Sequence, residues 1–190
     1  MIFDWYMKRI LVIGDTHIRE RADEIPNVFM RFFRERRYDY IIHTGDLVDP
    51  EVIDVLKTIS PRIYVVEGNM DYLDLPDHLV LNEEGVRIGV AHGHQVRPRG
   101  NIERLTKLAR ELGVSILISG HTHTPFIEEY EGILHINPGS ATGVWGGGGG
   151  SMTPSFIEIE FTDDKKMVVY LYELERERIV LKTVKEIFLS

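Results

Sequence analysis

Five short apolar runs, each followed by a cluster of glycine and polar residues, constrain the fold of this chain more than any other feature. The runs begin at Ile10, Tyr40, Ile63, Val86 and Val114 and are rich in β-branched residues. Short continuous apolar runs are typical of strands that are buried on both faces. Amphipathic segments lie between several of them, so the pattern predicts βαβ units around a largely parallel sheet.

Three of the intervening segments have the spacing of amphipathic helices. We expect the first to follow Asp23 as its N-cap. The second is expected to have Asp49 as its N-cap and Pro50 at the first helical position. The third should open at Asn101 and end at Gly113, because asparagine caps helix N-termini and glycine commonly ends helices.

The last third of the chain has a different pattern. Residues 126–136 have the composition of a hairpin, and residues 157–161, 167–172 and 179–184 have that of further strands. We therefore expect a second sheet of antiparallel character, packed on the first.

A run of five consecutive glycines occupies positions 146–150, between the hairpin and the last strands. Such a run offers no side chain to a core and is very flexible. A mobile loop is the favoured interpretation. The alternative is a loop that gates substrate or contacts the site closely.

Length and composition favour one domain that spans residues 1–190, with residues 1–6 as an N-terminal extension and residues 143–151 as a glycine-rich loop.

The formal charge of −8 argues against broad nucleic-acid binding. The start lacks a basic leader, and no apolar run is long enough to cross a bilayer, so we expect a cytoplasmic protein without a membrane partner. A homodimer, formed through the N-terminus and the C-terminal strands, stays open.

The chain has no cysteine and eight histidines. A metal site must therefore use imidazole, carboxylate and amide oxygen, which suits Zn, Mn, Fe, Ni or Co. Donors of these kinds follow the apolar runs, at the edge of a parallel sheet where ligands usually bind. They are Asp15, His17, Asp46, Asn69, His92, His121 and His123. Seven such donors suit two divalent ions better than one.

The motifs that contain these donors have a specific order along the chain. They are Asp15-Thr-His17, Gly45-Asp46, Gly68-Asn69-x-Asp71, His92-Gly-His94 and Gly120-His121-Thr-His123. In this order they resemble the calcineurin-like metallophosphoesterase superfamily, over roughly residues 8–142. The short length and Asn137-Pro-Gly-Ser140 are similar to its small YfcE-type phosphodiesterase branch, which includes the retromer phosphoesterase-fold subunit. The resemblance implies an α/β fold, a four-layer α/β/β/α sandwich of two mixed sheets flanked by helices.

The resemblance also implies two metal-binding groups that share one residue. One ion would be held by Asp15, His17, Asp46 and His123, and the other by Asp46, Asn69, His92 and His121. Two divalent ions (Mn, Ni, Fe, Co or Zn) with a bridging hydroxide would hydrolyse phosphate esters. Two cations, two carboxylates and one hydroxide leave a net charge of about +1, which attracts phosphate.

One departure from the superfamily concerns the leaving group. Many members follow the asparagine ligand with a proton-donating histidine, and here that position is Met70. A thioether cannot transfer protons, so the donor is Asp71, His94 or no residue. An alternative role for Asp71 is to orient a metal ligand, and His94 is also expected to contact a phosphate oxygen. Weak acid assistance favours esters with good leaving groups, and the branch is associated with phosphodiesters. We therefore expect phosphodiesterase activity to exceed phosphomonoesterase activity.

The rival function is a catalytically weak scaffold for protein interactions, because the retromer subunit is thought to act mainly in that way. All seven ligand positions carry usable donors, which favours a metal-dependent phosphoesterase that acts on a small phosphate ester or nucleotide. His43 is expected to pack behind the site. His78 and His135 are expected to be structural. Arg97 and Arg99 closely follow His94 and are candidates for substrate contact.

Overall fold

The computed structural model describes residues 6–189 and contains two mixed sheets. The first sheet is built from β1 (Tyr6–Ile13), β2 (Tyr40–His43), β3 (Ile63–Val65), β9 (Ser155–Thr162), β10 (Lys166–Glu175) and β11 (Arg178–Phe188). Its order is β11-β10-β9-β1-β2-β3. The strands β1, β2 and β3 are parallel, and β9 runs antiparallel to β1. The long chain-terminal hairpin β10–β11 continues this sheet beyond β9.

The second sheet has five strands. They are β4 (His78–Glu83), β5 (Val86–Ala91), β6 (Ile116–Ser119), β7 (Phe126–Tyr130) and β8 (Ile133–Asn137). Their order is β4-β5-β6-β8-β7, with β5, β6 and β8 parallel in the centre and an antiparallel strand at each edge.

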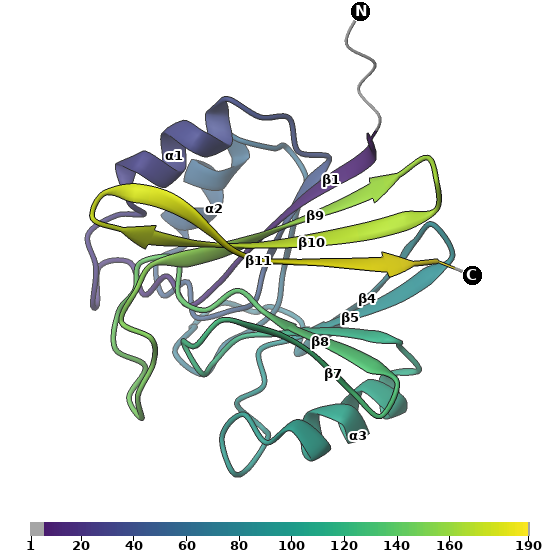
Figure 1. Cartoon of the computed structure of the whole chain (residues 1–190). Coiled ribbons are helices and arrows are strands. Elements are labelled where there is room, and N and C mark those ends of the chain that lie inside the picture. Colours follow the sequence, from purple (N-terminus) through teal and green to yellow (C-terminus); the bar gives the residue numbers. More distant parts are fainter. Residues whose placement is uncertain (1–5, 190) are drawn as a thin grey trace, which may run out of the picture.

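Within residues 6–189, three helices cover the two sheets from outside (Figure 1). α1 (Asn27–Arg34) and α2 (Glu51–Lys57) lie on the first sheet, and α3 (Ile102–Leu112) lies on the second. The inner faces of the sheets share one apolar core, in which Ile10, Ile88 and Ile118 are fully buried. This arrangement confirms the four-layer α/β/β/α sandwich, and it brings the carboxyl ends of β1, β2, β5 and β6 to one seam between the sheets.

The expected ends of the third helix are confirmed, whereas the expected start of the second helix is wrong by one residue. Asn101 caps α3 by accepting a hydrogen bond from the Arg104 amide at 2.9 Å, and Gly113 ends the helix at φ 65°. Asp49 accepts a hydrogen bond from the Glu51 amide at 2.8 Å, as a capping residue would. Pro50 is itself the N-cap and not the first helical residue.

The expected cap of the first helix is wrong. α1 begins at Asn27 after Pro26, and the Pro26 carbonyl accepts hydrogen bonds from the Phe29 and Met30 amides. Asp23 lies in the loop before it, where Ile18 and Ala22 form an isolated bridge. Proline locks its own φ and favours helix starts, so it overrides the weaker signal three residues earlier.

The division of strands between the sheets also differs from the expectation. β9, β10 and β11 extend the first sheet because β9 pairs with β1, while the hairpin β7–β8 joins the second sheet beside β6. β4 was not predicted, because its sequence has only three consecutive apolar residues and most of the strand is not fully buried. The expected extension of residues 1–6 falls almost wholly outside the described residues, and Tyr6 begins β1.

No helix within residues 6–189 combines the length and the apolar character that crossing a membrane requires.

Candidate metal centre

The structure brings the predicted donors together at the seam between the two sheets. Asp15 and His17 follow β1, Asp46 follows β2, and Asn69 lies on the segment after β3. From the second sheet, His92 and His94 follow β5, and His121 and His123 follow β6. Each donor sits just past the carboxyl end of its strand, as the parallel pairing predicts.

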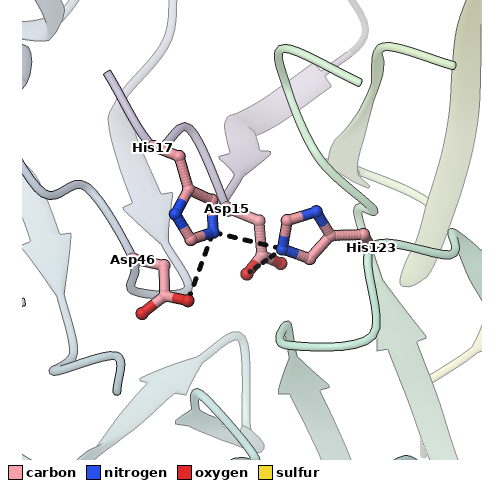
Figure 2. A group of neighbouring side chains, drawn as sticks. All are labelled: Asp15, His17, Asp46 and His123. Atoms are coloured by element: carbon pink, nitrogen blue, oxygen red, sulfur yellow. Dashed lines mark hydrogen bonds and ion pairs between the residues drawn. The ribbon is translucent and has the colours of Figure 1, made fainter. Parts of the chain in front are cut away.

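The first group consists of Asp15, His17, Asp46 and His123. One donor atom from each lies within 4.8 Å of the others, and Figure 2 shows the side chains pointing toward one another. The Nε2 atoms of His17 and His123 are 3.2 Å apart. His17 Nε2 lies 3.3 Å from Asp46 Oδ2, and His123 Nε2 lies 3.3 Å from Asp15 Oδ1.

The second group consists of Asp46, His92 and His121, with the side chain of Asn69 beside them. His92 Nε2 is 3.4 Å from Asp46 Oδ2 and 3.3 Å from Asn69 Oδ1. The same Asp46 oxygen therefore faces His17 of the first group and His92 of the second. Of the residues described, Asp46 is the member common to both groups.

Backbone carbonyls determine which nitrogen of two of these histidines faces the site. His92 Nδ1 lies 2.7 Å from the Thr44 carbonyl, and His123 Nδ1 lies 2.7 Å from the Val144 carbonyl. A carbonyl can only accept, so each Nδ1 carries the proton and donates it. Nε2 is therefore the nitrogen that each ring directs at the site. In the metal-free chain His92 Nε2 contacts Asp46, and a metal ion would replace the proton there, so the donor set fits a divalent metal pair.

Asp46 is held by contacts at both carboxylate oxygens. Its Oδ1 accepts a hydrogen bond from the Met70 amide at 2.8 Å, while Oδ2 faces the two histidines. Burial alone would raise the pKa of Asp46, but the hydrogen bonds from His17, His92 and the Met70 amide outweigh it and hold that pKa well below its usual range. Gly68 lets the chain pass this close, because a Cβ there would lie 2.2 Å from the Asp46 amide nitrogen.

Five of the donor residues have left-handed backbone. The φ angles are 48° for Asp15, 44° for His17, 55° for Asp46, 68° for His121 and 56° for His123. This region costs a non-glycine residue roughly 1–2 kcal/mol, and such strain concentrates at functional sites. The turns are tied to one another, since the Asp15 amide donates to the Gly45 carbonyl and the His17 amide to the Asp46 carbonyl, both at 3.0 Å.

The site is closed on one side and open on the other. Asp15, His17, Asp46, His92 and His123 are each at most 2% exposed. Asn69 is exposed and His121 is half-buried, so solvent can reach the second group. Burial lowers the pKa of His121 to about 4, and the charges of His92 and Arg99 act in the same direction. His121 is therefore a neutral imidazole at neutral pH, the form that binds metal.

Asp71 lies directly behind Asp46 and is buried. Its Oδ2 accepts hydrogen bonds from the amides of Asp46 and Gly68, both at 2.8 Å, and its Oδ1 accepts one from the Val48 amide at 2.9 Å. Both oxygens are thus occupied by backbone donors on the two loops that carry Asp46 and Asn69.

His94 borders the second group. Its ring centre lies 5.5 Å from that of His92 and 6.4 Å from that of His121. The ring is half-buried, and its Nδ1 has no hydrogen-bond partner among residues 6–189. Burial lowers the pKa of His94, and the charge of His92 adds to this effect. His94 is therefore neutral at neutral pH and keeps one N–H for donation.

The other singled-out residues lie in different surroundings. His43 is buried behind the site, 3.3 Å from the Thr16 hydroxyl, and its Nδ1 accepts a hydrogen bond from the Gly45 amide at 3.2 Å. His135 is buried beside the Thr106 hydroxyl of α3, and His78 is exposed on β4. Arg97 is exposed, whereas Arg99 is half-buried and donates to the carbonyls of His121 and Gly146.

Sequence reasoning missed the backbone groups that orient the donors, namely the carbonyls of Thr44 and Val144 and the amide of Met70. Every residue has these groups, so no residue type marks them. The one available signal was the glycine-rich composition of residues 143–151, which allows the backbone of this loop to lie close to other residues of the site.

Known proteins resemble this chain in sequence and in fold. Residues 7–160 match the calcineurin-like phosphoesterase superfamily domain. A probable metallophosphoesterase of Methanocaldococcus jannaschii is 48% identical over 131 residues, which cover 69% of this chain and 67% of that protein.

Solved structures of vacuolar protein sorting 29 (Vps29) are also similar. The protein from Cryptosporidium parvum has a TM-score of 0.89 and 29% identity, over 97% of this chain and 100% of that one. A zinc complex of Vps29 from Entamoeba histolytica has a TM-score of 0.82 and 34% identity, over 94% of this chain and 98% of that one.

Proposed function

The chain belongs to the calcineurin-like phosphoesterase superfamily, and from this membership we propose that it hydrolyses phosphate esters, phosphodiesters above monoesters, with two divalent metal ions. The observation that carries the proposal is the position of Asp46 Oδ2, which lies 3.3 Å from His17 Nε2 and 3.4 Å from His92 Nε2. One carboxylate oxygen between two sets of donors is what a bridged metal pair requires. The activity is assigned to a single domain, and the substrate is a small phosphate ester or nucleotide.

The proposed ligands divide as the two groups do. Asp15, His17, Asp46 and His123 would hold one ion, and Asp46, Asn69, His92 and His121 the other. Nitrogen and oxygen donors of this kind accept Mn, Ni, Fe, Co or Zn, and a similar Vps29 structure contains zinc. When bound, such a pair supplies Lewis acidity and a strongly acidified water as nucleophile.

The protein's own residues orient this chemistry. The carbonyls of Thr44 and Val144 accept the Nδ1 protons of His92 and His123, so that Nε2 is the nitrogen each ring would offer to a metal ion. The Met70 amide holds Asp46 Oδ1, so that Oδ2 remains available for sharing. The open side at Asn69 and His121 admits the substrate.

The preference for phosphodiesters rests on proton donation. Met70 occupies the position after Asn69 and cannot protonate a leaving group. Both oxygens of Asp71 accept backbone hydrogen bonds, which supports a positioning role for this carboxylate. His94 has an unpartnered buried nitrogen beside the second group, which supports a role in contacting phosphate or the leaving group.

Replacing His94 with alanine is expected to slow hydrolysis in proportion to how poor the leaving group is. The loss should be about 100-fold for diphenyl phosphate, the scale of general acid assistance, and much smaller for bis(p-nitrophenyl) phosphate, whose leaving group needs no proton. The measurement is kcat for both esters with Mn²⁺. His78→Ala is the matched control, since His78 is exposed on β4. Equal losses on both esters would rule out proton donation by His94.

The proposed function is tested by metal-dependent hydrolysis. The protein is freed of metal, reloaded with Mn²⁺ or Ni²⁺, and assayed with bis(p-nitrophenyl) phosphate and p-nitrophenyl phosphate under identical conditions. We expect two bound ions per chain and faster turnover of the diester. Faster turnover of the monoester would overturn the diester preference. Tight metal binding without hydrolysis of either ester would favour the scaffold alternative, to which the similarity with Vps29 also points.

A further inference from the structure

The glycine-rich loop that joins β8 to β9 is bound tightly to one of the proposed metal ligands. At one end, the Val144 carbonyl accepts the hydrogen bond from His123 Nδ1 at 2.7 Å. At the other end, the Ser151 amide donates to the His123 carbonyl at 3.0 Å. Between them, the Gly146 amide donates to the Gly149 carbonyl at 2.9 Å and closes the loop on itself. The loop thus holds both the ring and the backbone of His123.

The glycines allow the loop to lie directly on the imidazole. A Cβ on Gly146 would lie 2.8 Å from His123 Cγ, and a Cβ on Gly150 would lie 2.9 Å from His123 Cβ. Side chains essentially never approach this closely, so the present packing excludes any residue with a Cβ at these two positions. A Cβ on Gly147, in contrast, would point into open space.

Arg99 connects the loop to a second proposed ligand. Its guanidinium donates from Nη1 to the Gly146 carbonyl at 2.5 Å and from Nη2 to the His121 carbonyl. One half-buried side chain, between β5 and α3, thereby joins the loop to the strand end that carries both histidines. The planar guanidinium fixes two acceptors in a defined geometry, which a lysine cannot do.

We propose that Arg99 and residues 144–151 form a clamp that positions His121 and His123 for metal binding, an inference that rests on the proposed metal centre. The two histidines have strained left-handed backbone, with φ angles of 68° and 56°. The clamp contacts the His121 carbonyl, the His123 carbonyl and the His123 ring, and so holds the turn in this geometry before metal arrives. A preorganised site loses less conformational freedom on binding and so binds more tightly. Arg99 is therefore a positioning residue, not a substrate contact.

The test measures Mn²⁺ affinity of the full metal-free chain by competition with a chelating dye, and the visible spectrum of the Co²⁺-loaded protein. Loss of an outer hydrogen bond typically costs a metal site 10–100-fold in affinity, so we expect about tenfold or greater weakening for Arg99→Met and Gly146→Ala. Both Co²⁺ spectra should shift, because the ligand geometry changes. Arg99→Lys keeps a cationic donor but on a single nitrogen, so its Mn²⁺ affinity should fall between those of Arg99→Met and the wild type.

Gly147→Ala is the matched control, because it makes the same substitution one residue away without a contact to His123. Its Mn²⁺ affinity and Co²⁺ spectrum should remain close to those of the wild type, even though φ of 82° makes the loop less stable with alanine there. The clamp is overturned if Gly147→Ala weakens Mn²⁺ binding as much as Gly146→Ala does. It is also overturned if the wild type binds two Mn²⁺ ions and the Arg99 variants bind them with the same affinity. Wild-type protein that binds no Mn²⁺ would overturn the metal centre and the clamp together.

Discussion

Replacing Asp46 with asparagine is expected to lower kcat for phosphodiester hydrolysis about 10³-fold, since the metal pair contributes several kcal/mol to the transition state and each 1.4 kcal/mol is tenfold. Asp46 Oδ2 is the atom that faces donors of both groups. Asparagine removes one of two carboxylate charges at the centre, and a neutral amide oxygen is a poor bridge between two cations. The bound metal should fall from two ions per chain to one.

The measurement combines elemental analysis of the Mn²⁺-loaded protein with kcat on bis(p-nitrophenyl) phosphate. Asp54→Asn makes the same substitution on α2, where the side chain is 76% exposed, and it should leave both quantities unchanged. Asp46→Asn protein that retained two ions and wild-type kcat would contradict a shared carboxylate. Retention of two ions with low kcat would place the role of Asp46 in catalysis rather than in metal retention.

Replacing Asp71 with asparagine is expected to lower the free energy of unfolding of the metal-free protein by about 3 kcal/mol. One of its three hydrogen bonds is lost and leaves an N–H group without an acceptor, at roughly 1–3 kcal/mol, and the two that remain lose the help of the negative charge. The three donors are the amides of Asp46, Val48 and Gly68. Asparagine has one oxygen, so its NH₂ group would face at least one of these N–H groups without an acceptor.

Urea unfolding of the metal-free protein measures this effect without any contribution from bound metal. Asp74→Asn, at an exposed position of the same loop, is the control and should change stability little. The experiment also separates the two roles considered for Asp71. If Asp71 is a positioning carboxylate, Asp71→Asn lowers stability and metal affinity and lowers kcat to a similar extent for every ester. If Asp71 is a proton donor, stability stays at the wild-type value and the loss of kcat depends on the leaving group.

The strand ends were the part of the site that the sequence could predict. Asp15, Asp46 and His92 each follow a buried apolar run, and parallel strands place their carboxyl ends at one edge. The residue types then restrict the chemistry to imidazole and oxygen donors. The prediction depends only on local pattern and on a general rule of sheet topology, which is why the donors could be named without coordinates.

The elements that the sequence did not predict correctly lack such a local pattern. β4 lies at the edge of its sheet and is only partly buried, so hydrophobic pattern marks it weakly. β9 pairs with β1, although the two strands are far apart in the chain, and the composition of the two segments does not indicate that they pair. The glycine run at 146–150 favoured a mobile loop, and its contacts with His123 depend on where the turn after β6 lies in space.

The sequence by itself determined which side chains could bind metal and that they would gather at the carboxyl ends of the strands. Tertiary structure alone decided that Asp46 lies in both donor groups, that Asp71 accepts hydrogen bonds from backbone amides, and that His92 and His123 direct Nε2 toward the other donors. The physical reason is that these assignments depend on backbone N–H and C=O groups brought from distant segments. Those groups are the same in nearly every residue, so their positions become informative only once the chain has folded.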